Sequence, residues 1–141
     1  MTNALEAKGL WKSYGEKVVL KGIDLCVRQG DIFALLGVNG AGKTTALECI
    51  EGLRKYEKGT ISVNGKIGIQ LQSAALPAHI KGEEALRLFA KWNRKTPDAS
   101  MLAALGVDAI AHKQYQEMST GQKRRLHLAL ALICDPDIVF L

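Results

Sequence analysis

The feature that most constrains this sequence is a glycine-rich run that ends in a lysine and a threonine. Gly37, Gly42, Lys43 and Thr44 match the pattern G-x-x-x-x-G-K-S/T. Glycines allow successive backbone N–H groups to curve inward into a nest that binds anions. A helix that begins at the lysine points the positive end of its dipole at the same place. The run therefore predicts a phosphate-binding loop, the P-loop, between a strand and a helix.

The segments on either side of this loop fit that prediction. The run 31–36 is short and almost wholly apolar, so we expect a strand buried on both faces of a parallel sheet. The run 43–53 has helical spacing, with four apolar residues on one side: Ala46, Leu47, Ile50 and Leu53. The simpler alternative is a glycine-rich turn that only caps a helix, and the strand–loop–helix context disfavours it.

The loop residues have separable roles in holding a phosphate. Lys43 is expected to reach the β- and γ-phosphates as a mobile cation, and it is a candidate catalytic residue. The Thr44 hydroxyl is placed to ligate Mg²⁺, and Thr45 could touch another phosphate oxygen. The candidate nucleotide-binding residues of the loop are Gly37, Val38, Asn39, Gly40, Ala41, Gly42, Lys43, Thr44 and Thr45. A P-loop alone does not choose between a transporter ATPase, a kinase and a GTPase.

The first half of the chain is rich in β-type residues. The runs 5–14 and 17–27 flank a short glycine turn and predict a hairpin. Two further short strands are expected at 59–63 and 67–71, around an Asn-Gly pair that is a strong turn signal.

The second half predicts helices at 83–93, 98–105 and 119–133, followed by an apolar β-type run at 138–141. The first of these helices directs two apolar residues away from its main apolar side: Leu88 and Trp92.

The segment 118–122, Met-Ser-Thr-Gly-Gln, begins the last predicted helix. Ser119 and Gln122 form an S-x-x-Q capping box, which is a common helix start. Three cations follow at once and oppose the helix dipole: Lys123, Arg124 and Arg125. Cations at a helix start, where the dipole disfavours them, suggest an anion nearby. These residues alone leave both interpretations open, a helix cap and a phosphate site.

Together with the P-loop, this segment resembles the signature motif of the ATP-binding-cassette ATPases, usually Leu-Ser-Gly-Gly-Gln. The sequence departs from that motif at Met118 and Thr120. The other three residues are retained: Ser119, Gly121 and Gln122. The resemblance implies that 119–122 contacts the γ-phosphate of an ATP held on the P-loop of a second subunit. It therefore implies a head-to-tail dimer with two ATP molecules between the subunits.

The same resemblance implies the fold. It is an α/β fold with a P-loop NTPase core, whose sheet is RecA-like and mostly parallel, an N-terminal antiparallel β-subdomain and a helical subdomain. Residues 1–141 would form one partial domain. In it, 1–72 would be the β-subdomain and P-loop core, 73–117 the helical subdomain, and 118–141 the signature helix and the start of the next strand.

Two further positions acquire roles from the resemblance. Tyr14 falls where the family stacks an aromatic ring on adenine, and without the family it is an exposed hairpin tyrosine. Gln72 matches the glutamine that touches Mg²⁺ and the attacking water, so it joins Lys43 as a candidate catalytic residue and Thr44 as a candidate metal ligand. Gln70 is the alternative, since either side chain could do that chemistry.

The acids that the family uses for hydrolysis do not appear in this sequence. The family follows four apolar residues with Asp-Glu, and 138–141 supplies only the apolar residues. Phosphoryl transfer needs neutralised charge and an oriented water. Three glutamates on or after the P-loop helix are poor substitutes: Glu48, Glu51 and Glu57. We expect the family's ATPase activity in a complete protein, negligible hydrolysis by this chain alone, and a fragment or truncated product.

Residues 48–53 are similar to the corresponding segment of bacterial and archaeal drug- and lipid-export ATPases, although the segment between Val63 and Ile67 is shorter than in those proteins. The resemblance thus implies a subunit that binds ATP and Mg²⁺ and drives export through a membrane permease. Its partners would be a second ATPase subunit and permease subunits, on the cytoplasmic face of the cell membrane, with no nucleic acid.

A soluble cassette ATPase acting on nucleic acid or the ribosome is the alternative, which the net charge of +5 permits. A non-cassette P-loop kinase would leave 119–122 far from any phosphate of a partner.

Composition adds limits rather than a function. Hydrophobic residues make up 48% and charged residues 23%, the balance of a soluble globular protein. The longest apolar runs fall well short of the roughly 20 residues needed to cross a bilayer. The three cysteines form no metal-binding spacing, and each sits among apolar neighbours. We interpret them as reduced core residues, which favours the cytosol.

Overall fold

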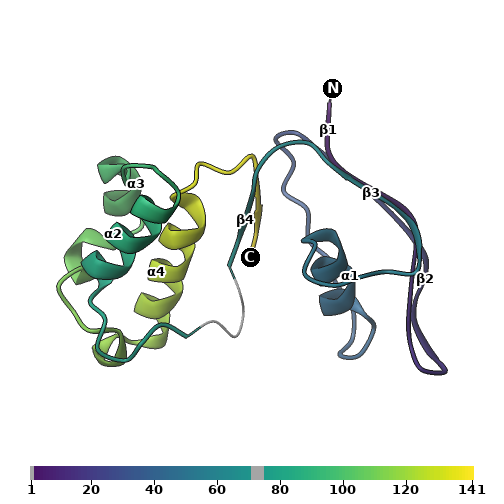
Figure 1. Ribbon diagram of the computed structural model, residues 1–141, viewed down its shortest axis with the longest axis horizontal. Helices are drawn as coiled ribbons and strands as arrows, with labels where there is room; N and C mark the ends of the chain where they lie inside the picture. Colours follow the sequence, from purple (N-terminus) through teal and green to yellow (C-terminus); the bar gives the residue numbers. More distant parts are fainter. Residues whose placement is uncertain (1, 71–74) are drawn as a thin grey trace. The chain divides into compact units, whose positions relative to one another are not determined.

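The computed structural model describes residues 2–70 and 75–141, coloured along the chain in Figure 1. It divides into two compact units, Met1–Gly65 and Lys66–Leu141, and each is described by itself. Within the described ranges, no helix has the length and apolar character that crossing a membrane requires.

The N-terminal unit is built on a long hairpin. Strands β1 (Asn3–Tyr14) and β2 (Lys17–Arg28) pair antiparallel, and β3 (Lys58–Val63) pairs with the other edge of β1. The three-stranded sheet therefore has the order β2-β1-β3, and the predicted hairpin is confirmed. Alternation along the strands buries one face of this sheet. Its most deeply buried side chains are Leu5, Ala7, Leu10 and Leu20.

Helix α1 (Lys43–Ile50) follows the glycine-rich loop, as predicted, but it is shorter than the expected 43–53. The helix ends because Gly52 adopts a positive φ of 78°, which an α-helix does not allow. Leu53 consequently leaves the apolar side of the helix and is exposed.

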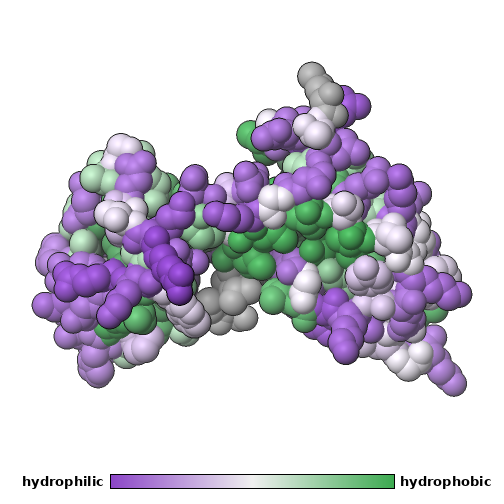
Figure 2. Space-filling model, turned by 45° about the horizontal axis from the view of Figure 1, so that its top comes forward, coloured by the Kyte–Doolittle hydropathy of each residue, from purple (hydrophilic) through white to green (hydrophobic). Residues whose placement is uncertain are grey.

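The predicted buried strand at 31–36 does not form, and that prediction is wrong. The segment has no regular secondary structure, and Ile32 and Leu36 are 102% and 88% exposed. A parallel strand buried on both faces needs neighbouring strands and a cover on each face. Among the described residues, no strand pairs with this segment. Figure 2 shows apolar surface gathered on this unit, which carries most of the exposed large hydrophobic side chains: Tyr14, Ile32, Phe33, Leu36, Val38, Leu53 and Tyr56.

The C-terminal unit contains a short parallel pair of strands. β4 (Ile67–Ile69) lies beside β5 (Ile138–Phe140), with Gly68 opposite Val139. The two strands that flank the Asn-Gly turn, β3 and β4, thus belong to different sheets and do not pair with each other. The apolar run at 138–141 is confirmed as a strand over its first three residues.

Helices α2 (Gly82–Trp92), α3 (Ala99–Ala104) and α4 (Thr120–Leu132) occupy the predicted positions in this unit. Two 3-10 turns, η1 (Asp108–Ile110) and η2 (Tyr115–Glu117), connect α3 to α4. These elements share one hydrophobic core: Ala85, Leu86, Ala90, Val107, Ile110, Tyr115, Met118, Leu126, Ala129, Leu130 and Ile133. The core fixes the start of α4, where the second motif lies.

The cysteines are only partly as predicted. All three are free thiols, Cys49 is buried and Cys134 is half-buried, but Cys26 is exposed. The prediction of three core cysteines is wrong for Cys26 because β2 turns successive side chains to opposite faces. Leu25 and Val27 take the inner side, and Cys26 takes the outer side.

Candidate phosphate-binding site

The glycine-rich loop makes a tight turn just before α1. The Ala41 N–H donates to the Val38 carbonyl at 3.1 Å, and Gly40 and Gly42 have positive φ angles of 84° and 94°. A Cβ atom at Gly42 would lie 3.0 Å from Val19 Cγ1, on β2. Positive φ and this close approach together require glycine at position 42. Sequence reasoning did not identify Val19, because its contact with the loop is set by the fold.

The N-terminus of α1 is left open by the protein. Gly42 occupies the N-cap position, no side chain caps the helix, and its first turn carries no acidic residue. The first helical hydrogen bond runs from the Ala46 N–H to the Gly42 carbonyl at 2.8 Å. The amides that precede it have no acceptor within the helix, and they share its positive dipole end. This arrangement can bind an anion.

Lys43 lies across the same loop. Its ammonium Nζ donates to the Gly37 carbonyl and, at 2.9 Å, to the Val38 carbonyl. The loop carbonyls thus hold the charge next to the open helix end, where a phosphate would offer a stronger, charged acceptor. The remaining loop residues, 38–41, are exposed, as is Thr44, while Thr45 is half-buried.

Thr44 provides a hydroxyl for Mg²⁺ but not a complete metal site. Among the described residues, no group of three or more His, Cys, Asp or Glu could hold a metal ion. Mg²⁺ typically keeps several waters and binds through few protein ligands together with substrate phosphates. The exposed Thr44 hydroxyl fits that mode, in which the ion arrives with the nucleotide and neutralises phosphate charge.

Tyr14 lies at the end of β1 with two cations against its ring. Lys12 Nζ is 5.2 Å and the Arg54 guanidinium 5.5 Å from the ring centroid. Arg54 Nε also pairs with Glu48 at 2.5 Å, and this hydrogen bond raises the pKa of Arg54. Sequence reasoning missed Lys12 and Arg54, since neither stands in a motif. Tyr14 is exposed at the hairpin, and its role toward adenine stays a prediction.

Two of the glutamates that follow the P-loop are bound to other side chains, and the third is half-buried. Glu48 is bound to Arg54, and the Glu57 carboxylate accepts from the Ser13 hydroxyl at 2.8 Å, which lowers the pKa of Glu57. Burial, with Glu48 nearby, raises the pKa of Glu51. These contacts agree with the interpretation that none of the three replaces the family's water-orienting acid.

The second motif starts α4 with the predicted capping box. Ser119 Oγ accepts from the Gln122 N–H at 3.2 Å, and Gln122 Oε1 accepts from the Ser119 N–H at 3.0 Å. A serine hydroxyl that accepts one bond still has its own proton to donate. Since Ser119 is exposed, it can cap the helix and also donate to a phosphate. The two interpretations of this motif are therefore compatible.

Two of the three cations after the motif have local partners. Lys123 Nζ lies 4.8 Å from the centre of the Tyr115 ring, and Arg125 Nη1 donates to the Leu105 carbonyl at 3.5 Å. The Tyr115 hydroxyl is 3.0 Å from His127 Nε2, and burial lowers the pKa of His127. These contacts account for part of the positive charge at the start of α4 without an anion.

Only one of the two candidate glutamines, Gln70, lies among the described residues. Gln72 lies outside the described residues. Gln70 donates from Nε2 to the Arg124 carbonyl of α4 at 3.3 Å. This contact ties Gln70 to a helix backbone, and the assignment of the Mg²⁺- and water-contacting role to Gln72 stays a prediction.

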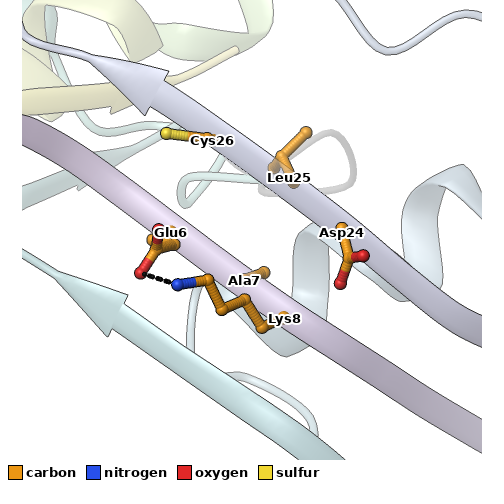
Figure 3. A pocket seen from close by; sticks show the side chains of 6 residues that line it. All are labelled: Glu6, Ala7, Lys8, Asp24, Leu25 and Cys26. Carbon is orange, nitrogen blue, oxygen red and sulfur yellow. Dashed lines mark ion pairs between the residues drawn. The ribbon is translucent and has the colours of Figure 1, made fainter.

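A pocket of about 420 Å³ lies elsewhere, on β1 and β2 (Figure 3). Its polar groups are engaged with each other or with the backbone. Lys8 pairs with Glu6 at 3.0 Å, and Asp24 accepts from the Gly9 N–H at 2.6 Å. The pocket therefore offers no free charged group and is not the candidate site.

Comparisons with known proteins agree with this geometry. A family model described as "ABC transporter" matches residues 20–141. The linearmycin resistance ATP-binding protein LnrL of Bacillus subtilis (strain 168) is 32% identical over 155 residues, covering 97% of this chain and 50% of that protein. The Fe(3+) ions import ATP-binding protein FbpC of Fusobacterium nucleatum is 30% identical over 159 residues, covering 100% of this chain and 43% of that protein. The chain spans about half the length of such curated relatives.

Solved structures confirm the fold class. An ATP-binding subunit of an ABC transporter superposes with a TM-score of 0.82 at 26% identity, over 96% of this chain and 64% of that chain. The α/β fold with a P-loop core, a β-subdomain and a helical subdomain is thus confirmed. The finer division at residues 72 and 117 stays a prediction.

Proposed function

We propose that this chain, which belongs to the ABC transporter ATPase family, binds MgATP through residues 37–45 as the ATP-binding subunit of a transporter. The observation that carries this proposal is the open N-terminus of α1, with Lys43 held beside it. The loop amides and Lys43 would hold the phosphates, Thr44 and Gln72 would hold Mg²⁺, and Tyr14 would contact adenine.

The shared site is the second part of the proposal. Ser119, Thr120, Gly121 and Gln122 would contact the ATP of a second copy in a head-to-tail dimer. The free hydroxyl proton of Ser119 supports this role. Gly121 supports it too, because a Cβ there would meet nothing within 4 Å and no local contact requires glycine. A glycine at an exposed helix start that lacks a local reason suits close approach of a ligand.

The process that the complete protein drives is the third part. The relatives' names support a transporter over a soluble nucleic-acid ATPase or a P-loop kinase, and they include both a resistance protein and an importer. The proposal of export rests on the similarity of residues 48–53 to export ATPases. The complete protein would hydrolyse ATP and sit on the inner face of the cell membrane, bound to a permease. With Glu48 and Glu57 bound to other side chains and Glu51 half-buried, we expect negligible turnover by this chain.

Isothermal titration of MgATP tests the binding site. Lys43→Ala is expected to weaken affinity roughly 10–100-fold, since hydrogen bonds to charged groups contribute about 1.5–3 kcal/mol. Lys21→Ala, which removes the same charge from an exposed position of β2, serves as the matched control and should not change affinity. Equal affinities for wild type and Lys43→Ala would refute the site.

A further inference from the structure

Helix α2 exposes an apolar stripe on its outer side. Leu88 and Trp92 are 53% and 79% exposed, and their spacing of four residues places them one above the other on the helix. The Trp92 ring has an edge contact with Phe89, with ring centroids 6.3 Å apart. The core side of α2 is already occupied by Ala85, Leu86 and Ala90. The stripe is therefore an additional apolar surface and not a displaced part of the core.

Positive charge surrounds this stripe. Arg87 and Lys91 form a second exposed row beside it, and Arg94 and Lys95 follow the end of the helix. The sequence has no acidic residue between Glu84 and Asp98. None of these four cations forms an ion pair in the part of the chain that the structure describes.

The acidic residues of α2 lie at its other end. Glu83 and Glu84 stand in the first turn, and Glu84 Oε2 accepts from the Lys81 N–H at 2.8 Å as part of the N-terminal cap. The charges of α2 are therefore divided along its length, and the end that carries Trp92 is purely cationic.

Cations at a helix C-terminus interact favourably with the helix dipole. This explains the position of the cations but not the exposure of Leu88 and Trp92. A cationic row beside a leucine–tryptophan stripe is typical of helices that lie in a membrane interface. There, tryptophan places its ring at the headgroup level, and lysine and arginine pair with anionic lipid phosphates. We propose that the exposed face of α2, extended by Arg94 and Lys95, binds the surface of a bilayer that contains anionic lipid. This contact uses no nucleotide-binding residue, so it holds or fails independently of the ATP site.

Vesicle flotation without nucleotide tests this surface. The probes are vesicles of phosphatidylcholine alone and of phosphatidylcholine mixed with phosphatidylglycerol. The wild-type chain is expected to float with the anionic vesicles only, and less so at high salt. Lys91→Glu/Lys95→Glu should lower the partition coefficient at least about tenfold, and Trp92→Ser several-fold. Lys17→Glu/Lys21→Glu, with the same charge change on β2, is the matched control and should still float.

Four outcomes would overturn the proposal. The first is that the wild type does not float, and the second is that Trp92→Ser floats as well as the wild type. The third is that the β2 control loses as much flotation as Lys91→Glu/Lys95→Glu. The fourth is that the wild type does not bind vesicles but self-associates, and that Trp92→Ser abolishes this self-association. The last would assign the stripe to a second copy of the chain. Circular dichroism of each variant verifies its fold, and two separate variants on α2 protect the test against one that does not fold.

Discussion

The helices that follow the two candidate motifs, α1 and α4, begin in opposite ways. α1 begins at a left-handed glycine, with no side-chain cap and Lys43 beside its open end. α4 begins at Ser119, whose capping box satisfies the helix start from within. The first helix thus leaves its amides for an anion from outside. The second caps its Gln122 amide with Ser119 and still has the Ser119 hydroxyl proton and the first amides of the helix to offer, so it suits a supporting contact to a phosphate that another loop already holds.

The glycines next to these starts sharpen the contrast. Gly42 is fixed by its backbone conformation and by contact with β2, whereas Gly121 is helical and faces open space. Fold alone explains the first glycine. The second costs helix stability although no contact within the chain requires glycine there, which supports the proposed contact with a second copy.

The largest effect is expected for Gly42→Ala. A left-handed alanine that also meets Val19 should destabilise the N-terminal unit by roughly 1–3 kcal/mol and weaken ATP binding. Gly40→Ala, with a similar φ but nothing within 4 Å of its new Cβ, should cost less. Urea unfolding followed by Trp11 fluorescence, in a Trp92→Phe background, measures both. Equal losses would show that the contact with β2 does not hold the loop.

Ser119→Ala should come next. Loss of the capping box is expected to destabilise the C-terminal unit by about 1 kcal/mol, and Ser119→Asp should restore most of it because aspartate also caps helices. Trp92 fluorescence in a Trp11→Phe background reports on this unit. The affinity of a single chain for ATP should not change, and a large change would mean that the two helix starts are not separate in function.

Gly121→Ala should raise the stability of the C-terminal unit, whereas Ser119→Ala lowers it. Alanine is a better helix former, so the C-terminal unit should gain up to about 1 kcal/mol. In the complete protein, the same change should weaken ATP-dependent association of two copies, seen by analytical ultracentrifugation. If the association of two copies is unchanged, or becomes stronger as the stability rises, Gly121 does not belong to the shared site.

The smallest effect concerns pH. Burial lowers the pKa of His127 below its ordinary 6.5, so the unfolded chain binds the proton more readily. Stability from this group is present above about pH 6.5 and is lost as pH falls from there toward the lower pKa of the folded chain. His127→Gln should flatten the dependence of the Trp92 transition, whereas exposed His112→Gln should not. A wild-type profile identical to that of His127→Gln would contradict this.

Local patterns predicted the hairpin, the helix positions and the cap of α4, because turn glycines and Ser119 act on neighbours in sequence. The strand at 31–36 was predicted wrongly because its burial depends on partner strands, which no local pattern supplies. Cys26 was assigned to the core because its neighbours are apolar, although strand parity turns it outward. The cations around Tyr14 could not be predicted, since Arg54 reaches the ring only through the fold. The outward stripe of α2 was visible in the spacing of Leu88 and Trp92, but its exposure and unpaired charge were not.

The central claim is that the open start of α1 holds the phosphates of ATP. Hydrogen exchange of the backbone amides of Lys43, Thr44 and Thr45, with and without MgATP, tests it most directly. At concentrations too low for association, these amides should become protected, while those of 120–122 at the start of α4 stay unchanged. Unchanged exchange at 43–45 in a chain that binds MgATP would contradict the account.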